Sequence, residues 1–553
     1  MPIESEIAKA APSSGMTAKR YLPWVVATAL FMEQLDSTIV NTAIPSMASS
    51  LGVAPLSLKA VVTSYILSLA VGIPVSGWIA DRFGTRRVFS IAVAMFTLAS
   101  VACGLSVNVP MLVAARIVQG LGAAMMTPVG RLAIVRTFDK SELLVAMNFV
   151  IIPALIGPLL GPTVGGLIVH WMSWREIFFV NVPIGIAALF IIHRYMPDYH
   201  GERPRPLDVV GLVLFGSGTA ILSWLLEIFG EHSIGVVEAG VLLLVSVSLL
   251  AAYGWHARSA AHPLLDLALF KLRTFRVSVV GGFATRLGVG GMPFLLPLLY
   301  QLGLGLPAWE SGLLMMPTAA AAMGMKFLST PLLRRYGFRA VLIVNTVLVG
   351  ATICMFSSIT PSMPLSFIVL LGLTQGFCNS LQFSSLNSMA YAEIRPTDSS
   401  MATSIASTLQ QLSLSFGLAC GSLIAGWYLG SVAQTDQQAV MTALHRTFLT
   451  VGGLTIVSSI AFWTLRPSDG DNVSRGKMAT QRGSPASQRR RHHKYTCVDR
   501  SAGLNAVPAE KHARRHSRLL GFPVRCLRPY RTTNGFRDKY GSGHFLLQPR
   551  TAS

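Results

Sequence analysis

Residues 72–88 read GIPVSGWIADRFGTRRV, and a degenerate copy of this stretch, MKFLSTPLLRRYGFRAV, occupies residues 325–341. A second echo pairs VQGLGAAMMTPVGR (118–131) with TQGFCNSLQFSSLN (374–387). The two offsets, 253 and 256 residues, are nearly equal, so the sequence predicts two homologous halves. Membrane transporters built from such parallel halves hold their substrate between the halves, near the middle of the bilayer.

Long apolar runs surround these repeats. Hydrophobic residues make up 52% of the chain and charged residues 12%, which is low for a soluble protein. A helix needs about 20 apolar residues to cross a bilayer. We therefore predict an all-helical integral membrane protein with fourteen transmembrane helices. The runs lie near residues 22–47, 58–79, 88–107, 111–134, 144–169, 176–195, 207–228, 235–256, 277–302, 311–332, 340–359, 363–387, 402–429 and 443–465.

These runs divide the chain into five parts: a short N-terminus, a six-helix half, a linker with two extra helices, a second six-helix half and a basic tail. The predicted boundaries are 1–21, 22–195, 196–256, 257–466 and 467–553.

Charge sets the predicted orientation. With the N-terminus inside, the inner loops hold 20 Lys and Arg residues and the outer loops three. Positive loops stay in the cytoplasm, so both termini should be cytoplasmic in a multi-pass protein of the plasma (inner) membrane. The first apolar run is too long and too interrupted for a cleaved signal peptide, so we interpret it as a membrane span.

The tail carries much of the net charge of +21, because residues 467–553 contain 18 Lys and Arg against 5 Asp and Glu. It lacks apolar periodicity, so we expect it to be disordered. Three interpretations stay open: a polybasic segment drawn to anionic lipid, a nucleic-acid-binding segment without the aromatic residues that would support it, and the product of a shifted reading frame after about residue 475.

The sequence shows no motif for a catalytic or metal-binding site. The six cysteines form no CxxC pair, the chain has no GxxxxGK[ST] loop for a nucleotide, and no nucleophile–base pair stands out. We expect no enzyme activity, no cofactor and no metal.

An acid lies in the middle of the first apolar run. An ionised carboxylate there costs about 2.5–3.5 kcal/mol on insertion scales, so Asp36 suits a proton carrier or a counter-ion for a cationic substrate; a structural, hydrogen-bonded carboxylate is the alternative. Glu33 lies three residues earlier on the same helix face and could share a proton with it, or could lie in a wet vestibule. Arg116 stays charged, so it must face the bundle interior and find an acceptor there; a helix clamp without a role in turnover is the alternative.

Four motifs within residues 30–190 make the chain resemble the fourteen-helix drug:proton antiporters of the major facilitator superfamily. The motifs are LDSTIVNTAIP (35–45) in the first helix, GWIADRFGTRR (77–87) in the loop between helices 2 and 3, RIVQGLGAAMMTP (116–128) in helix 4, and GPLLGPTVGG (157–166) in helix 5, followed by SWREIFFVNVPIG (173–185). Taken together these motifs are specific, whereas the second half resembles the family more loosely.

The resemblance implies roles for each motif. It implies that Arg116 influences the proton affinity of the neighbouring carboxylate, for which Asp36 is the candidate, and that the 77–87 loop braces one conformational state and releases in the other. We expect Gly77 to allow close helix contact, Gly84 to allow a tight turn, and Asp81 to pair with one of the three arginines of the loop, Arg82, Arg86 or Arg87. The alternative is that the loop only sets topology. The gating residues are Gly77, Asp81, Arg82, Gly84, Arg86 and Arg87.

In helix 5, the glycines at every fourth position should form a smooth stripe and the prolines should favour a kink. We expect this helix to lie at the seam between the halves; generic small-residue packing is the alternative. The motif residues are Gly157, Pro158, Gly161, Pro162, Gly165 and Gly166.

Polar residues within the other runs are candidates for the substrate cavity, although each could equally hold helices together. Arg286 could meet an anionic substrate group. The candidates are Gln34, Asn41, Gln119, Arg286, Gln301 and Gln375. In the alignment of the two repeats, ionisable residues of the first half are replaced in the second: Asp81 aligns with Arg334, Arg116 with Gly372 and Arg131 with Asn387. Because the first half keeps these ionisable residues, proton or ion coupling should lie mainly there.

We therefore expect a secondary transporter that exports amphipathic, drug-like compounds in exchange for protons by alternating access, with protons, a small molecule and the lipid bilayer as partners and no nucleic acid. The alternatives are a proton-independent facilitator or exporter of an anionic metabolite, and a membrane receptor whose basic tail is the effector. The sequence patterns assign no particular substrate, proton stoichiometry, oligomeric state or accessory efflux protein.

Overall fold

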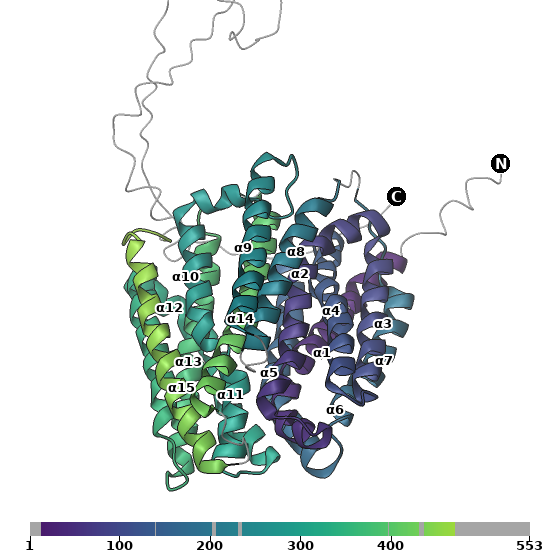
Figure 1. The fold of residues 1–553 in the computed structure, drawn as a ribbon. Helices are drawn as coiled ribbons and strands as arrows, with labels where there is room; N and C mark the ends of the chain where they lie inside the picture. The colour runs from purple at the N-terminus through teal and green to yellow at the C-terminus, as the bar shows by residue number, and fades with distance from the viewer. Residues whose placement is uncertain are drawn as a thin grey trace, which may run out of the picture. The chain divides into compact units, whose positions relative to one another are not determined.

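A computed structural model describes residues 13–138, 140–201, 206–229, 235–395, 398–430 and 436–470. Every regular element in these ranges is a helix (Figure 1), which confirms the all-helical fold. Residues 1–12 and most of the basic tail, 471–553, lie outside the described residues, so the predictions for them stay predictions.

The helices follow one another with short connections. They are α1 (Ser13–Leu51), α2 (Lys59–Phe83), α3 (Thr85–Gly104), α4 (Val109–Thr137), α5 (Lys140–Trp171), α6 (Glu176–Phe179), α7 (Asn181–Tyr195), α8 (Val209–Phe229), α9 (Val236–Ser259), α10 (Arg273–Val289), α11 (Met292–Leu298), α12 (Ala308–Met355), α13 (Leu365–Ala390), α14 (Ser399–Leu429) and α15 (Gln437–Ser458). Shorter turns include η2 (Pro55–Leu58), the π-helical turn η4 (Leu299–Gly303) and η7 (Ser459–Thr464).

Eleven of the described helical stretches are long and apolar enough to cross a membrane. One of them, Ala308–Ser358, contains two of the predicted runs. The first helix, α1, and α5 are not among the eleven, although Ile156–Trp171 of α5 is a shorter apolar helix. The count of fourteen spans therefore stays a prediction.

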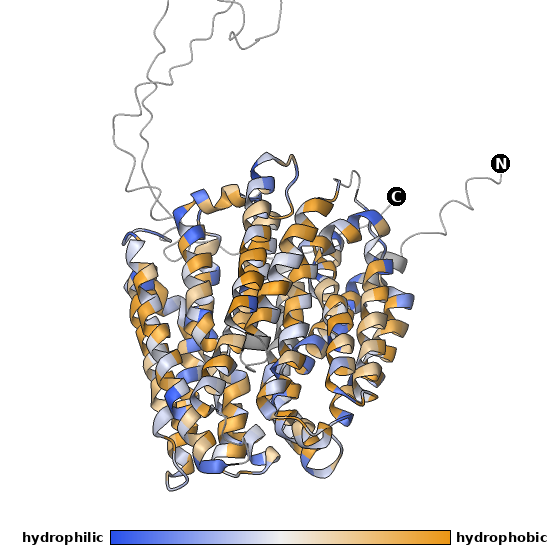
Figure 2. Cartoon of the chain, in the orientation of Figure 1, coloured by the Kyte–Doolittle hydropathy of each residue, from blue (hydrophilic) through white to orange (hydrophobic). Residues whose placement is uncertain are grey.

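Hydrophobic residues predominate along the helices (Figure 2), and many large apolar side chains are exposed on them. Phe190, Trp255 and Phe327 are 73%, 77% and 84% exposed. Apolar surface on this scale marks a membrane-facing or protein-binding surface, and in helices of membrane length it fits contact with lipid tails.

The repeated motif makes the same backbone turn twice. Gly84 joins α2 to α3 with φ 92°, and Gly337 interrupts α12 with φ 75°. Residues with a Cβ rarely adopt these angles. The repeat found in the sequence is therefore a repeat of backbone conformation, and Gly337 divides α12 where the sequence predicts a break between two spans.

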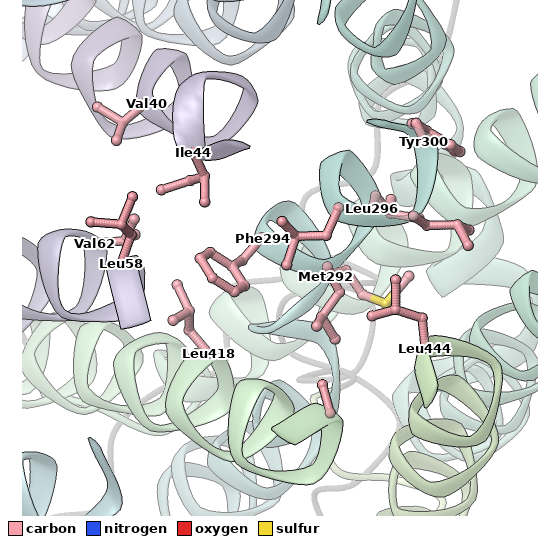
Figure 3. Packing of buried hydrophobic residues seen from close by; sticks show 14 of the residues in the cluster. Val40, Ile44, Leu58, Val62, Met292, Phe294, Leu296, Tyr300, Leu418 and Leu444 are labelled. Carbon is pink, nitrogen blue, oxygen red and sulfur yellow. The ribbon is translucent and has the colours of Figure 1, made fainter. Parts of the chain in front are cut away.

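The buried apolar cores are distributed unevenly between the halves. One core draws only on helices of the first half, such as Phe89 and Phe96, and another only on the second, such as Phe338 and Met389. A third core joins Ala70 and Val75 of α2 to Ile405 and Leu412 of α14, together with residues of α8, α9 and α10. The fourth spans both halves at the end of the bundle that carries the turn between α1 and α2, which we call the 51–59 end. Figure 3 shows part of this shared core: Val40, Ile44, Leu58 and Val62 of the first half lie near Phe294 and Leu418 of the second.

Direct hydrogen bonds between the halves lie at the same end. The amide of Gln301 donates to the Thr42 carbonyl at 2.9 Å, and the Thr163 hydroxyl to the Gly312 carbonyl at 3.3 Å. The Ser415 hydroxyl donates to the Thr63 carbonyl at 3.4 Å. In the described part of the chain these hydrogen bonds between the halves thus lie at the 51–59 end, while the core between α2 and α14 joins the halves elsewhere.

The two extra helices, α8 and α9, pack on each other, and α8 also packs on α2 and α14, one from each half. Asp208, before α8, fixes their ends: its carboxylate lies 2.7 Å from Nε2 of His256 and accepts from the amides of Gly211 and Leu264. Burial works against ionisation of Asp208, but these hydrogen bonds hold its pKa below the usual value.

Candidate functional site

Asp36 is fully buried in the middle of α1 and forms an ion pair with Arg116 of α4. Arg116 Nη1 lies 2.6 Å from Asp36 Oδ2, and both side chains are 0% exposed. Two opposite charges this close inside a bundle interact far more strongly than on a surface, and each offsets the burial of the other. The structure thus brings together the two residues that the sequence places in the proton-coupling site.

The second carboxylate oxygen is held by two amides from different helices. Gln119 of α4 donates to Asp36 Oδ1 at 2.9 Å, and Asn181 of α7 donates to the same oxygen at 2.8 Å. Both amides also reach the Ser100 hydroxyl of α3, at 2.6 Å and 3.2 Å. Four helices therefore converge on one carboxylate, which we call the Asp36 network.

Sequence reasoning missed Asn181 as a site residue, although it lies in the quoted SWREIFFVNVPIG motif. A neutral amide in an apolar helix carries no charge signal, and its role is visible only when α7 is placed beside α1. The short α6 ends one residue before α7, and α7 packs on both α1 and α3, which directs Asn181 into the network.

Arg116 uses most, but not all, of its donors. Nη1 also donates to Gln119 Oε1 at 2.6 Å, and Nε donates to the Val61 carbonyl at 3.2 Å. The guanidinium lies over the Tyr65 ring, 4.1 Å from its centroid, a cation–π contact. Within the described residues, Arg116 Nη2 and the Tyr65 hydroxyl are buried without a hydrogen-bond partner. Unsatisfied buried polar groups of this kind are rare and commonly mark a place for water or for chemistry.

Glu33 is buried but belongs to a separate contact. It accepts a hydrogen bond from the Thr127 hydroxyl of α4 at 2.6 Å. No hydrogen bond between Glu33 and Asp36 is found among the described residues, so the structure does not bring the two acids into direct proton-sharing contact. Both acids are nevertheless held by α4, one by Arg116 and the other by Thr127.

The 77–87 loop is built differently from the sequence expectation. Asp81 pairs with Arg136 at the end of α4, Oδ1 to Nη2 2.7 Å, rather than with its neighbours in the loop. Arg86 instead donates to the His193 carbonyl at 2.6 Å, while Arg82 and Arg87 are exposed. The reason is geometric, because α2 packs along α4 and brings their ends together.

A strap of residues 197–201, which follows α7, covers this loop. The Thr85 amide donates to the Tyr199 carbonyl at 3.0 Å, and the Tyr199 amide to the Thr85 hydroxyl at 2.9 Å. The Gly201 amide donates to the Asp81 carbonyl at 3.0 Å. A Cβ on Gly84 would lie 2.5 Å from Asp198 Oδ1, so the close approach of the strap requires this glycine.

Gly77 does not make the expected close helix contact. A Cβ there would have no neighbour within 4 Å. The close approach between α2 and α4 is made one turn and a half earlier by Gly72, where a Cβ would lie 2.6 Å from that of Ala124. Glycine in the loop motif therefore marks the turn at Gly84 more clearly than the helix contact.

The glycine stripe of α5 faces α1 of the same half, not the seam between the halves. Cβ atoms on Gly157 and Gly165 would lie 2.8 Å from Gln34 Cβ and 2.5 Å from the Ile39 carbonyl; Gly161 is packed against Thr38 in the same way. The seam is formed by the adjacent face.

On that face Gly166 lies against the Ala308 carbonyl of α12, and Gly312 of α12 lies against the Pro162 carbonyl. The α5 helix thus contacts both α1 and α12, and the four-residue spacing identified a smooth face without identifying its partner. Pro158 also lies within α5.

The cavity candidates occupy different places. Gln119 belongs to the Asp36 network, Gln301 bridges the halves, and Gln375 pairs with Thr352. Asn41 donates to the Ser37 carbonyl at 3.5 Å, whereas its carbonyl oxygen is buried without a partner in the described structure. Gln34 is half-buried on α1.

Arg286 differs from these amides because it carries a charge. It lies on α10 with its guanidinium carbon 5.8 Å from the centre of the Phe383 ring of α13. The structure does not bring it to the Asp36 network. Among the described residues no group of three His, Cys, Asp or Glu side chains is placed to hold a metal ion.

Known proteins resemble this chain in sequence and fold. The family model described as Major Facilitator Superfamily matches residues 26–418 and 327–525. A protein named "Putative multidrug resistance protein MdtD" from Serratia proteamaculans is 37% identical over 444 residues, 79% of this chain and 92% of that protein. One of the same name from Salmonella paratyphi A is 39% identical over 433 residues, 78% and 90% of the two chains.

Solved transporters share the fold at low sequence identity. The POT family transporter PepTSo aligns with a TM-score of 0.60 at 16% identity, over 80% of this chain and 97% of its own. A D-xylose-proton symporter aligns with a TM-score of 0.58 at 14% identity, over 82% and 99%. The matching model, the relatives and the two-part helical bundle agree: this chain belongs to the major facilitator superfamily of membrane transporters.

Proposed function

We propose that the protein exports amphipathic, drug-like compounds from the cytoplasm in exchange for protons, by alternating access, as a multi-pass protein of the inner membrane. The names of the relatives support a multidrug substrate range. The 20-to-3 distribution of basic residues supports cytoplasmic termini. Under that orientation the 51–59 end faces outward.

The observation that carries the proposal is the ion pair of Asp36 and Arg116 at 2.6 Å, with both side chains fully buried. A carboxylate in this position can take up a proton, and the proton would remove the charge that holds Arg116. A buried arginine without its partner is costly. Proton uptake would therefore change the relative stability of conformations that differ in how α1, α4 and α7 surround the site, which is the requirement for coupling.

Two groups support a route for that proton. Arg116 Nη2 and the Tyr65 hydroxyl lie beside the pair and lack partners in the described structure. A water molecule that delivers a proton to Asp36 would find hydrogen-bonding groups there. Glu33, buried three residues earlier on α1, is a second protonatable group on the same helix.

Alternating access is supported by the uneven contact between the halves. The hydrogen bonds between the halves and the larger of the two shared cores lie at the 51–59 end, whereas each half also has a core of its own. The second shared core, between α2 and α14, would have to rearrange during the same motion. Rocking of one half on the other would open the 51–59 end and close the opposite one. The conformation described here then corresponds to the state closed toward the outside.

Everted membrane vesicles test the proposal. An imposed pH gradient, acidic inside, should drive accumulation of amphipathic fluorescent dyes into vesicles that contain the protein. Asp36→Asn should abolish gradient-driven accumulation, because the side chain no longer takes up a proton. Glu238→Gln, which neutralises an exposed carboxylate at the start of α9, is the matched control and should retain it.

Gradient-driven accumulation by Asp36→Asn at the wild-type rate would remove Asp36 from the proton path. Transport by the wild type that is independent of the gradient would instead favour a facilitator. Neither of these outcomes depends on the basic tail, which a deletion tests separately. Export that remains intact after the tail is deleted would argue against a receptor whose effector is the tail.

A further inference from the structure

Arg286 differs from the ion pair of the first half in having no acidic partner. Asp36 and Arg116 neutralise each other, but no acidic side chain pairs with Arg286 among the residues that the structure describes. Its contact is the Phe383 ring, 5.8 Å from the guanidinium carbon. A guanidinium stays charged under all physiological conditions, so this position holds a full positive charge within a transmembrane helix.

The neighbours of α10 show which way Arg286 faces. Gly281 and Gly288 pack against Phe462 and Thr455, from η7 and α15. The Ser278 hydroxyl donates to the Leu386 carbonyl of α13, and the Phe283 ring packs on Phe416 of α14.

With 3.6 residues per turn, Arg286 falls between the side of α10 that contacts α13 and the side that contacts α14. It lies opposite the side that contacts α15 and η7. An arginine in mid-membrane avoids lipid and faces the bundle interior or a water-filled space. Arg286 is half-buried, so its charge is not fully enclosed by protein.

An aromatic surface accompanies the charge. Phe383 is 42% exposed beside Arg286. A guanidinium next to an open aromatic face offers one charged and one apolar contact to the same ligand. Carboxylate and phosphate groups match the planar fork of arginine, and the ring suits an adjoining apolar body.

The acids of the first half are poorly placed to bind a cationic substrate instead. Both oxygens of Asp36 are occupied by donors from Arg116, Gln119 and Asn181. Glu33 accepts from Thr127. Within the described residues Arg286 is thus a partly accessible cation with no acidic partner, and it lies in the second half, away from the Asp36 network.

We infer that Arg286 and Phe383 form the recognition site for an anionic head group, and that the transported compounds include amphipathic anions with a carboxylate or related oxyanion next to an apolar ring system. This inference rests on the proposed export function and specifies its substrate class. Proton coupling in the first half and anion recognition in the second would then be carried by different helices.

A matched pair of dyes tests the inference by binding. Fluorescein is anionic near neutral pH, and a cationic rhodamine ester carries the same type of ring system. Fluorescence anisotropy with the purified full chain in lipid nanodiscs should show that fluorescein binds. Its Kd should rise about 10- to 100-fold in Arg286→Gln, because a charge-assisted contact is lost, and recover in part in Arg286→Lys. Arg276→Gln, at an exposed position of the same helix, is the control and should leave the Kd unchanged.

Equal fluorescein affinity in wild type and Arg286→Gln overturns the inference, and so does binding of the rhodamine ester without binding of fluorescein. The vesicle experiment separates this failure from failure of export. Rhodamine transport without fluorescein transport contradicts the anionic class while leaving export intact. Arg286-dependent fluorescein binding without transport of either dye would support the recognition site and contradict export.

Discussion

The two halves repeat the same helices but differ in how they fill their interiors. In the first half Gln119 supports an ion pair and contacts Ser100 of α3. Its repeat partner Gln375 contacts a hydroxyl in the corresponding place, Thr352 in the second part of α12. The position of Arg116, however, is occupied by Gly372 in the second half. The repeat has kept the amide–hydroxyl contact and lost the charge.

A second polar cluster of the second half is also neutral. Asn345 donates to the Cys378 carbonyl at 2.8 Å and to Gln382 Oε1 at 2.9 Å, and Gln382 in turn donates to the Thr346 hydroxyl. Neutral amides hold α12 and α13 together without a protonation state that could change. In these two clusters, the first half thus buries an ion pair where the second half buries neutral amides.

We expect the largest effect on stability from breaking the buried ion pair of the first half. Arg116→Met leaves Asp36 buried without its partner, and we expect the free energy of unfolding to fall by about 3–5 kcal/mol. The double variant Asp36→Leu with Arg116→Met removes both charges and should be less destabilised than the single variant. Chemical denaturation in detergent micelles would measure both, and a double variant no more stable than Arg116→Met would contradict a charge-balanced core.

The repeated turn tests whether the halves differ outside their polar cores. Gly84→Ala and Gly337→Ala both force a side chain into a glycine conformation, which costs on the order of 1–3 kcal/mol. At Gly84 a Cβ also meets Asp198 and His200 of the strap, whereas at Gly337 the nearest atom is 3.9 Å away.

We therefore expect Gly84→Ala near the top of that range and Gly337→Ala near the bottom. Thermal unfolding midpoints of the two variants, measured side by side in the same detergent, give the comparison. Equal decreases in the unfolding midpoint would mean that the strap moves aside at little cost. The two turns would then not differ in their tolerance of a side chain.

The smallest expected effect lies in the neutral cluster. Asn345→Leu removes two hydrogen bonds and should lower the free energy of unfolding by about 1–2 kcal/mol. Proton-driven dye accumulation, corrected for protein amount, should remain close to that of the wild type, because no charge is involved. A loss of gradient coupling comparable to that of Asp36→Asn would show that the second half also takes part in proton transfer.

The sequence was sufficient for features that depend on run length, periodicity and charge. Apolar runs predicted the helical membrane fold, and the duplicated glycine turns predicted the repeat. An arginine buried in a span needs an acceptor, and the family resemblance pointed to Asp36 as the carboxylate beside Arg116. The role of this pair in proton coupling stays a prediction.

Features that depend on which helices are neighbours could not be predicted. Asp81 has three arginines close in sequence but pairs with Arg136, because α2 and α4 end side by side. The spacing of the α5 glycines defined a smooth face, yet that face turned out to contact α1. Asn181 was missed because an uncharged amide gives no signal until its helix has been placed.

The contact of α5 with α12 has a consequence for the kinetics of transport. Where Gly166 meets Ala308 and Gly312 meets Pro162, main chain touches main chain with few side chains between them. Closing such a surface freezes few rotamers and therefore loses little conformational entropy. Under the proposed alternating access, the two helices would separate and meet again at little entropic cost, and a methyl group added at Gly166 or Gly312 would hold them apart.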